Sequence, residues 1–219
     1  FYGAEPLQGE ALRKVTLPNR PNSGILTHPF LLAAHAYHNN TSPIHRGVFI
    51  SRNVLGRLLK PPVEAVAFKD DEFDPALTMR EKITQLTKAT SCMECHRVIN
   101  PVGFSLENFD AVGRHRLQDN RKPVDTVTRY VNENEREIPI GSIHDIATMA
   151  AGSRLAHEAF ITQLFHHFTK QSINAYGADT KASLHAKFVK SGYNIRSLLV
   201  ELMQVVVSHE AKNKPLAAK

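Results

Sequence analysis

The amino-acid sequence predicts a mainly α-helical protein with one small β-hairpin. Apolar residues recur with helical spacing in several segments before residue 90 and again from residue 142 onward. Residues 124–140 form the single stretch with the alternation of β-strands. The 219 residues are 42% hydrophobic and 22% charged, which is typical of a folded globular chain and excludes a disordered one. A chain of this length buries enough apolar surface to fold without disulfides.

Proline and polar capping residues mark where the N-terminal helices begin. A His-Pro pair opens a helix predicted over residues 30–37, and a Ser-Pro pair opens a second over residues 44–59. The second helix is expected to stop at the Lys-Pro-Pro sequence that follows it. Further along, Thr78 and Glu81 have the spacing of a capping box, which predicts a helix over residues 79–89.

The second half of the chain is predicted as a hairpin followed by helices. Residues 99–113 are expected to form two loops around a short helical turn, and Pro139 confines the second arm of the hairpin at 124–140 to a sheet edge. The later helices are predicted at 143–151, 154–173, 180–192 and 194–208. The expected organisation is a covering segment at 1–23, a helical domain at 24–120, a hairpin connection at 121–141 and a C-terminal helical bundle at 142–219.

Charge and hydropathy exclude two classes of function. The chain has 27 Lys and Arg residues and 21 Asp and Glu residues, a net charge of +6, but no basic run is longer than two residues. This spread does not predict nucleic-acid binding, and it favours solubility or docking to an acidic partner. The best apolar stretch, Leu198 to Val207, is interrupted by Glu201 and Gln204, so no integral membrane span is predicted.

The two cysteines of the chain are its most informative residues. They are Cys92 and Cys95, and His96 follows directly. The pattern Cys-x-x-Cys-His is typical of covalent c-type haem attachment, in which the thiols add across the haem vinyl groups and the histidine becomes the proximal iron ligand. We expect the helix before the motif to position it as a loop, with Ser91 capping the next turn.

A zinc half-site, a redox dithiol and a disulfide are the other interpretations of a Cys-x-x-Cys pair. Zinc needs two further ligands. The chain has no third cysteine, and its 12 histidines show no pair at the usual downstream spacing. A thioredoxin-like dithiol would follow a strand in a βαβ unit, which the helical pattern contradicts. Haem attachment is therefore the favoured interpretation.

The segment around the motif, ATSCMECHRVINPVGFSLENFDAVGRHR, closely resembles planctomycete-type cytochrome c domain proteins, which are large bacterial proteins of poorly defined function. Ile99 to Arg114 matches the family stretch IDPLGF-LENFDAVGR, and His115 stands where the family often has an aromatic residue. The resemblance extends over nearly all of residues 20–207. It implies a c-type haem-binding domain at 24–120, and a chain that is the C-terminal part of a longer polypeptide or a separate subunit.

A second axial ligand would distinguish an electron carrier from a haem enzyme. A Met or His on the far side of the iron closes the site, whereas an open position permits chemistry on peroxide or oxygen. His28, at a predicted helix start, is the favoured second metal ligand beside His96. Met149 and His166 are the alternatives, as is an open position.

Four residues are expected to surround the haem. Arg46 and Arg114 are the candidates for binding the haem propionates, because Arg pairs with carboxylates through two hydrogen bonds. Pro101 and Phe104 are expected to pack against the porphyrin, with a backbone carbonyl near Pro101 accepting the ring N–H of His96.

The sequence thus predicts a c-type cytochrome with one covalent haem c that transfers electrons to or from a partner redox protein or other domains of a longer polypeptide. No catalytic motif is found beside it. The alternatives are a peroxidase-like or oxygen-activating haem enzyme with an open sixth position, and a structural subunit of a larger exported complex. Covalent haem attachment implies a periplasmic or otherwise exported bacterial protein.

Overall fold

The computed structural model describes residues 8–11, 13–15, 17, 21, 24–60 and 66–213, with side chains as far as residue 209. The covering segment predicted over residues 1–23 lies mostly outside the described residues. The chain divides into two compact units. The first comprises Phe1–Arg52 and Arg57–Met149, and the second comprises Asn53–Gly56 and Ala150–Lys219.

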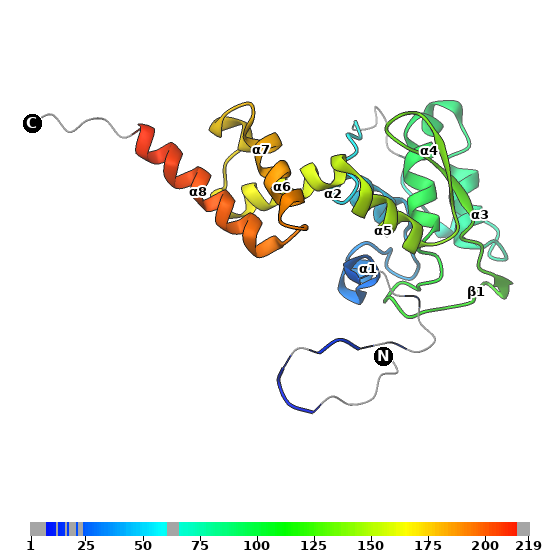
Figure 1. Cartoon of the computed structure of the whole chain (residues 1–219). Coiled ribbons are helices and arrows are strands. Elements are labelled where there is room, and N and C mark those ends of the chain that lie inside the picture. Colours follow the sequence, from blue (N-terminus) through cyan, green and yellow to red (C-terminus); the bar gives the residue numbers. More distant parts are fainter. Residues whose placement is uncertain are drawn as a thin grey trace, which may run out of the picture. The chain divides into compact units, whose positions relative to one another are not determined.

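Helices dominate the described part of the chain, which confirms the predicted fold class (Figure 1). The α-helices are α1 (Pro29–Ala34), α2 (Pro43–Asn53), α3 (Met79–Leu86), α4 (Thr90–Phe104), α5 (Ile143–Gly152), α6 (Arg154–Thr169), α7 (Thr180–Lys190) and α8 (Ile195–Asn213). The short 3-10 helices are η1 (Gly24–Thr27), η2 (Asp70–Glu72) and η3 (Ile173–Tyr176), and the strands are β1 (Gln118–Asp119), β2 (Lys122–Pro123), β3 (Thr128–Val131) and β4 (Glu137–Ile140).

The predicted helix starts are confirmed by the capping contacts. The Nδ1 atom of His28 accepts a hydrogen bond from the Phe30 backbone N–H at 3.2 Å, and proline occupies the first position of α1. At the start of α3, Thr78 and Glu81 form the reciprocal bonds of a capping box. The Met79 N–H at this helix end also donates to the Asp119 carboxylate at 2.7 Å.

Helix α2 ends at Asn53, six residues before the predicted end at residue 59. Gly56 accounts for part of the difference because its φ of +69° lies in the left-handed region and leaves the helical path. A Cβ atom at Gly56 would lie 2.8 Å from the backbone oxygen of Leu155 in α6, so the second unit needs a glycine here.

The largest departure from prediction is α4, which runs continuously from Thr90 to Phe104. The Cys-x-x-Cys-His motif was predicted in a loop and instead lies within this helix. Ser91 lies inside the first turn, and the residue before the helix, Ala89, makes no side-chain cap. Pro101 is accommodated within the helix, although proline removes one backbone hydrogen bond there. Tertiary packing explains this, because every residue from 98 to 104 is buried.

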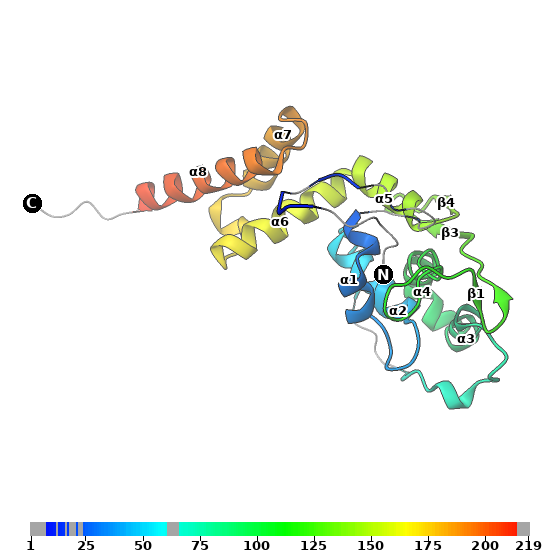
Figure 2. The ribbon, with the colours of Figure 1, turned by 90° about the horizontal axis from the view of Figure 1, so that it is seen from below.

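Helices α2 and α4 lie side by side in the first unit (Figure 2). Two glycines lie where the two helices cross. A Cβ atom on Gly47 of α2 would overlap the backbone oxygen of Ile99, and one on Gly103 of α4 would overlap the backbone oxygen of Pro43. Any larger residue would separate the backbones. The crossing therefore fixes the buried half of α4 against α2.

The predicted hairpin is confirmed as β3 and β4, which pair antiparallel with Arg129 opposite Pro139. Helix α4 packs against β3. A second, smaller hairpin of β1 and β2 was not predicted. Its two-residue turn, Asn120 and Arg121, has positive φ at both positions, as a type I′ turn requires. Strands of two residues have too little alternation to be recognised in the sequence.

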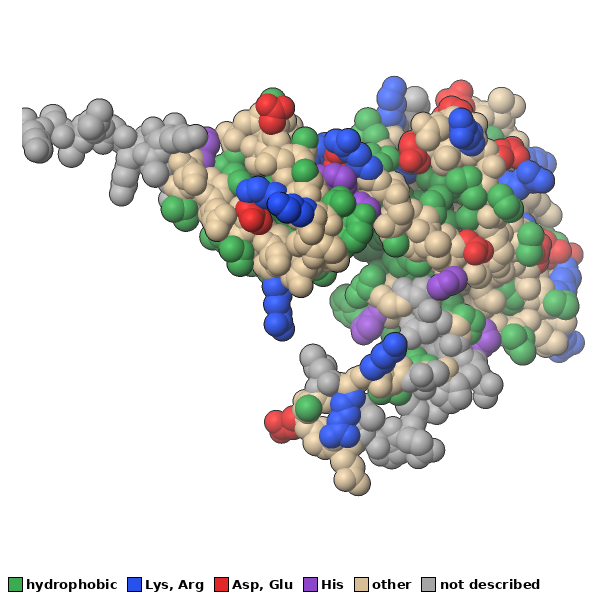
Figure 3. Space-filling model, viewed as in Figure 1, with side chains coloured by type: hydrophobic (Ala, Val, Ile, Leu, Met, Phe, Trp, Pro, Cys, Tyr) green, Lys and Arg blue, Asp and Glu red, His purple; other side chains and the backbone are tan. Residues whose placement is uncertain are grey.

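The second unit has its own hydrophobic core, formed by α6, η3, α7 and α8. Its buried members are Ile161, Phe165, Ile173, Leu184, Phe188, Leu198 and Leu202. The helices predicted over 154–173, 180–192 and 194–208 correspond to α6 with η3, α7 and α8. Among the described residues, no helix combines the length and apolar character needed to span a bilayer. On the face shown in Figure 3, positive and negative side chains are interspersed, without a large patch of one sign.

Candidate haem-attachment site

The motif occupies the accessible half of α4. Cys92, Cys95 and His96 are spaced i, i+3 and i+4, so they share one face of the helix. All three are half-buried, whereas Met93 and Glu94 between them are exposed. Both cysteines lie among the described residues and carry free thiols. This arrangement presents two nucleophilic sulfur atoms and one imidazole on the same accessible surface.

The imidazole of His96 is held by a side chain of its own helix. Its Nδ1 atom lies 2.8 Å from Oδ1 of Asn100, and Nδ2 of Asn100 donates to the Thr87 hydroxyl at 2.8 Å. The prediction that a backbone carbonyl near Pro101 accepts the ring N–H of His96 is wrong. The Pro101 oxygen instead accepts the Ser105 N–H at 3.1 Å, as the helix continues to its C-terminus.

These residues fit a covalently bound haem. The donor set of two thiols and one imidazole is the one that c-type attachment uses, and the second ring nitrogen of the histidine has a hydrogen-bond partner of the kind common to ligating histidines. In the described part of the chain, no group of three or more His, Cys, Asp or Glu side chains is placed to hold a metal ion. The described residues thus supply no further ligands for a zinc site.

An ion pair beside the motif was not foreseen from the sequence. Nη1 of Arg97 lies 2.7 Å from the carboxylate of Glu135, at the turn between β3 and β4. Both side chains are largely exposed, so the pair contributes less than about 1 kcal/mol to stability. The pair lies next to His96 and connects the motif half of α4 to the hairpin, so it helps to fix the position of this part of the helix.

The structure gives Arg46 a different role from the predicted contact with the haem propionates. Arg46 is fully buried, and its guanidinium donates to the backbone oxygens of Phe109 at 2.9 Å, Asp110 at 2.6 Å and Leu32 at 3.2 Å. Burial lowers its pKa to about 10, which leaves it charged at neutral pH. A side chain engaged in this way joins α1, α2 and the segment after α4, and has no accessible donors for a propionate.

Behind Arg46 lies a buried carboxylate that sequence reasoning missed. Glu107 is 2% exposed, and its Oε2 accepts from the Thr41 hydroxyl at 2.9 Å and from Arg116 at 2.9 Å. Burial raises the pKa of Glu107, and the nearby Arg116 and Arg46 oppose that rise. In the sequence, Glu107 lies in a largely apolar stretch that is flanked by charged residues. That pattern does not by itself predict that its carboxylate is buried.

The other predicted neighbours of the haem lie in different environments. Phe104 is 5% exposed and packs with Met79 and Ile83 under the Arg80 guanidinium, which lies 4.9 Å from its ring centre. Pro101 is also buried, so both residues belong to the core of the first unit. Arg114 is exposed, and its backbone N–H donates to the Asp110 carboxylate at 2.8 Å. Its contact with a propionate stays a prediction.

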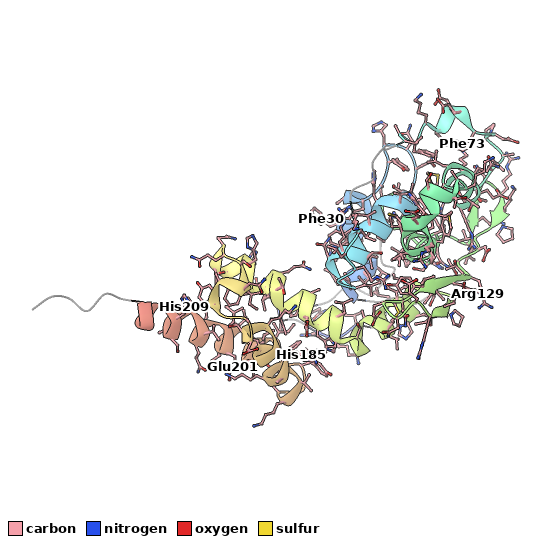
Figure 4. The ribbon with its side chains drawn as sticks, turned by 90° about the horizontal axis from the view of Figure 1, so that it is seen from above. Phe30, Phe73, Arg129, His185, Glu201 and His209 are labelled. Atoms are coloured by element: carbon pink, nitrogen blue, oxygen red, sulfur yellow. The ribbon has the colours of Figure 1, made fainter. Side chains whose placement is uncertain are left out.

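The three candidates for a second axial ligand remain predictions. His28 is exposed and caps α1 through Nδ1, next to Phe30, which is 77% exposed (Figure 4). Met149 is half-buried in α5. His166 is exposed on α6 in the second unit, with Nδ1 3.4 Å from the backbone oxygen of Gln171.

Comparison with known proteins supports the resemblance only over the part of the chain that carries the motif. Residues 22–119 match the family model PSCyt3, described as a protein of unknown function (DUF1588). The match covers slightly less than half of the chain and includes α1 to α4. Neither curated proteins nor solved structures gave a match. The first unit is therefore similar, over the helices that carry the Cys-x-x-Cys-His motif, to a planctomycete-type cytochrome c-related family of unknown function.

Proposed function

We propose that this protein is a c-type cytochrome with one covalently attached haem, and that it transfers electrons to or from a partner redox protein. The observation that carries the proposal is the placement of Cys92, Cys95 and His96 on one accessible face of α4. The similarity of residues 22–119, a range that includes the motif, to a cytochrome c-related family of unknown function also supports it.

Each residue of the motif has a distinct task. Cys92 and Cys95 would form the two thioether bonds, and His96 would bind the iron on the proximal side. When bound, the haem supplies one-electron chemistry at its iron. The chain contributes a rigid attachment surface, because the second half of α4 is buried and closely packed against α2 at Gly47 and Gly103.

The charge distribution favours a carrier that docks transiently. The net charge of +6 is spread over the chain, which suits association with an acidic partner by long-range attraction. Such attraction weakens as salt is added, because the Debye length shortens. Export to the periplasm or another extracytoplasmic compartment, and assembly with further domains of a longer polypeptide, are parts of the same proposal.

Covalent haem is tested by producing the chain in a bacterial host that attaches c-type haem outside its cytoplasmic membrane. Acid–acetone should leave the porphyrin with the protein. The double variant Cys92→Ala/Cys95→Ala should lose it, and Met93→Ala, which changes an exposed residue between the cysteines, should retain it. Release of the porphyrin from the unmodified chain would refute the proposal.

The carrier role is tested by adding carbon monoxide to the reduced protein. An electron carrier with two protein ligands should show an unchanged ferrous spectrum, because no coordination position is open. Rapid binding of carbon monoxide would contradict the carrier role and favour a haem enzyme with an open or displaceable sixth position.

A further inference from the structure

A chain of three hydrogen bonds connects His96 to the backbone of α3 through Asn100 and Thr87. The backbone carbonyl at the α3 end determines which ring nitrogen of His96 carries the proton. The Thr87 hydroxyl lies 2.8 Å from the backbone oxygen of Ile83. A carbonyl oxygen can only accept, so Thr87 must donate its single hydroxyl proton to Ile83. Toward its other neighbour, the Thr87 oxygen can then act only as an acceptor.

This requirement fixes the orientation of the Asn100 amide. The Asn100 side chain meets the Thr87 hydroxyl oxygen at 2.8 Å, and since that oxygen accepts, the amide NH₂ must face it. The amide oxygen therefore faces His96, at 2.8 Å from Nδ1. Asn100 is only 6% exposed and Thr87 only 3%, so water has little access to compete for either bond.

The orientation of Asn100 in turn selects the tautomer of His96. An amide oxygen accepts only, so Nδ1 of His96 must carry the proton. In the neutral ring, the lone pair then lies on Nε2. That is the nitrogen a ligating histidine needs free when its Nδ1 is hydrogen-bonded, and the bond at Nδ1 raises the basicity of the ring toward a metal.

We propose that Asn100 is the positioning residue of the proximal histidine: it holds His96 as the Nδ1–H tautomer and lowers the reduction potential of the iron through the hydrogen bond at Nδ1. This inference rests on the proposed function. A more basic ligand stabilises the ferric state relative to the ferrous state, which gives the sign of the effect. Because the acceptor is a side chain, it can be changed without altering the backbone of α4.

The first experiment measures the tautomer and does not depend on haem. Nitrogen-15 NMR of the full-length, haem-free chain, at a pH where the ring is neutral, should show the proton of His96 on Nδ1. The Asn100→Leu variant should lose this preference, and Thr87→Val should weaken it because the amide is then free to reverse. Asn40→Ala is the matched control, since Asn40 uses its amide to bind Asp70 at the surface. An Nε2–H tautomer in the unmodified chain would overturn the proposal.

The second experiment measures the reduction potential of the haem-loaded protein. Asn100→Leu removes the acceptor and should raise the potential, whereas Asn100→Asp supplies a stronger, charged acceptor and should lower it. Each change should alter the ferric-to-ferrous ratio at a fixed potential at least tenfold, which is about 59 mV for one electron. The Asn40→Ala control should leave the potential unchanged.

The outcomes separate this proposal from the proposed function. If the two Asn100 variants keep their covalent haem and share the potential of the unmodified protein, or shift it in the same direction, the positioning role is refuted while the cytochrome stands. If the unmodified chain carries no covalent haem, the proposed function fails, and the tautomer of the haem-free chain still decides whether Asn100 orients His96.

Discussion

Gly47 of α2 lies so close to Ile99 of α4 that a single added carbon would overlap the Ile99 backbone oxygen. Together with Gly103, which meets the backbone of Pro43 in the same way, this contact holds the buried half of the helix that carries the motif. The accessible half, with Cys92 and His96, continues from this fixed base. The helix face that carries the motif is thus positioned by backbone contacts that leave no space for side chains.

Substitution at this crossing should destabilise the protein. Gly47→Ala or Gly103→Ala should lower the free energy of unfolding by about 1–3 kcal/mol, the usual cost of overpacking a tight contact. Urea unfolding followed by circular dichroism measures it. Gly152→Ala is the matched control, because nothing lies within 4 Å of its added carbon. A tolerated alanine at both crossing positions would show that the two helices are not in close contact.

Loss of Arg46 should affect folding before it affects haem binding. Arg46→Met removes the guanidinium donor from the backbone oxygens of Phe109, Asp110 and Leu32, and it leaves Glu107 with one cation fewer. The expected loss of stability is about 3 kcal/mol or more. Arg46→Lys should restore little, because an ammonium group cannot reproduce the forked geometry of the guanidinium. A variant with normal stability and poor haem retention would instead support the propionate contact that the sequence predicts for Arg46.

The buried carboxylate of Glu107 should make stability depend on pH. Burial raises its pKa in the folded state above the ordinary value of 4.5, so between these two values the folded protein binds more protons at this site than the unfolded chain. The contribution of Glu107 to stability therefore falls as pH rises through that interval. Compared with Glu107→Gln over a pH series, the unmodified protein should lose stability progressively. A constant difference would mean that Arg116 and Arg46 cancel the effect of burial, and a difference of the opposite sign would mean that they outweigh it.

Local signals in the sequence were sufficient to predict several elements. Pro29 marks the start of α1, Thr78 and Glu81 cap α3, and Pro139 lies in the second arm of the hairpin. Each of these signals acts through residues at most a few positions away, which is why a sequence pattern reveals them. The apolar periodicity of the C-terminal helices is equally local.

Features that depend on contacts between distant residues could not be predicted in this way. Residues 99–113 were predicted to form two loops around a short helical turn, but burial of residues 98–104 keeps α4 helical through Pro101. Arg46 was predicted to bind a haem propionate because Arg pairs with carboxylates through two hydrogen bonds, whereas its partners are backbone oxygens in segments 14 to 64 positions away. The Asn100 contact with His96 has helical spacing, and became recognisable once the motif proved to lie within a helix.

The most direct test of a cytochrome function is mass spectrometry of the peptide that contains residues 92–96, from protein exported by a host that attaches c-type haem. We predict that this peptide is heavier by the mass of one haem and that neither Cys92 nor Cys95 reacts with an alkylating agent. A peptide of unmodified mass whose two thiols are both alkylated would contradict it.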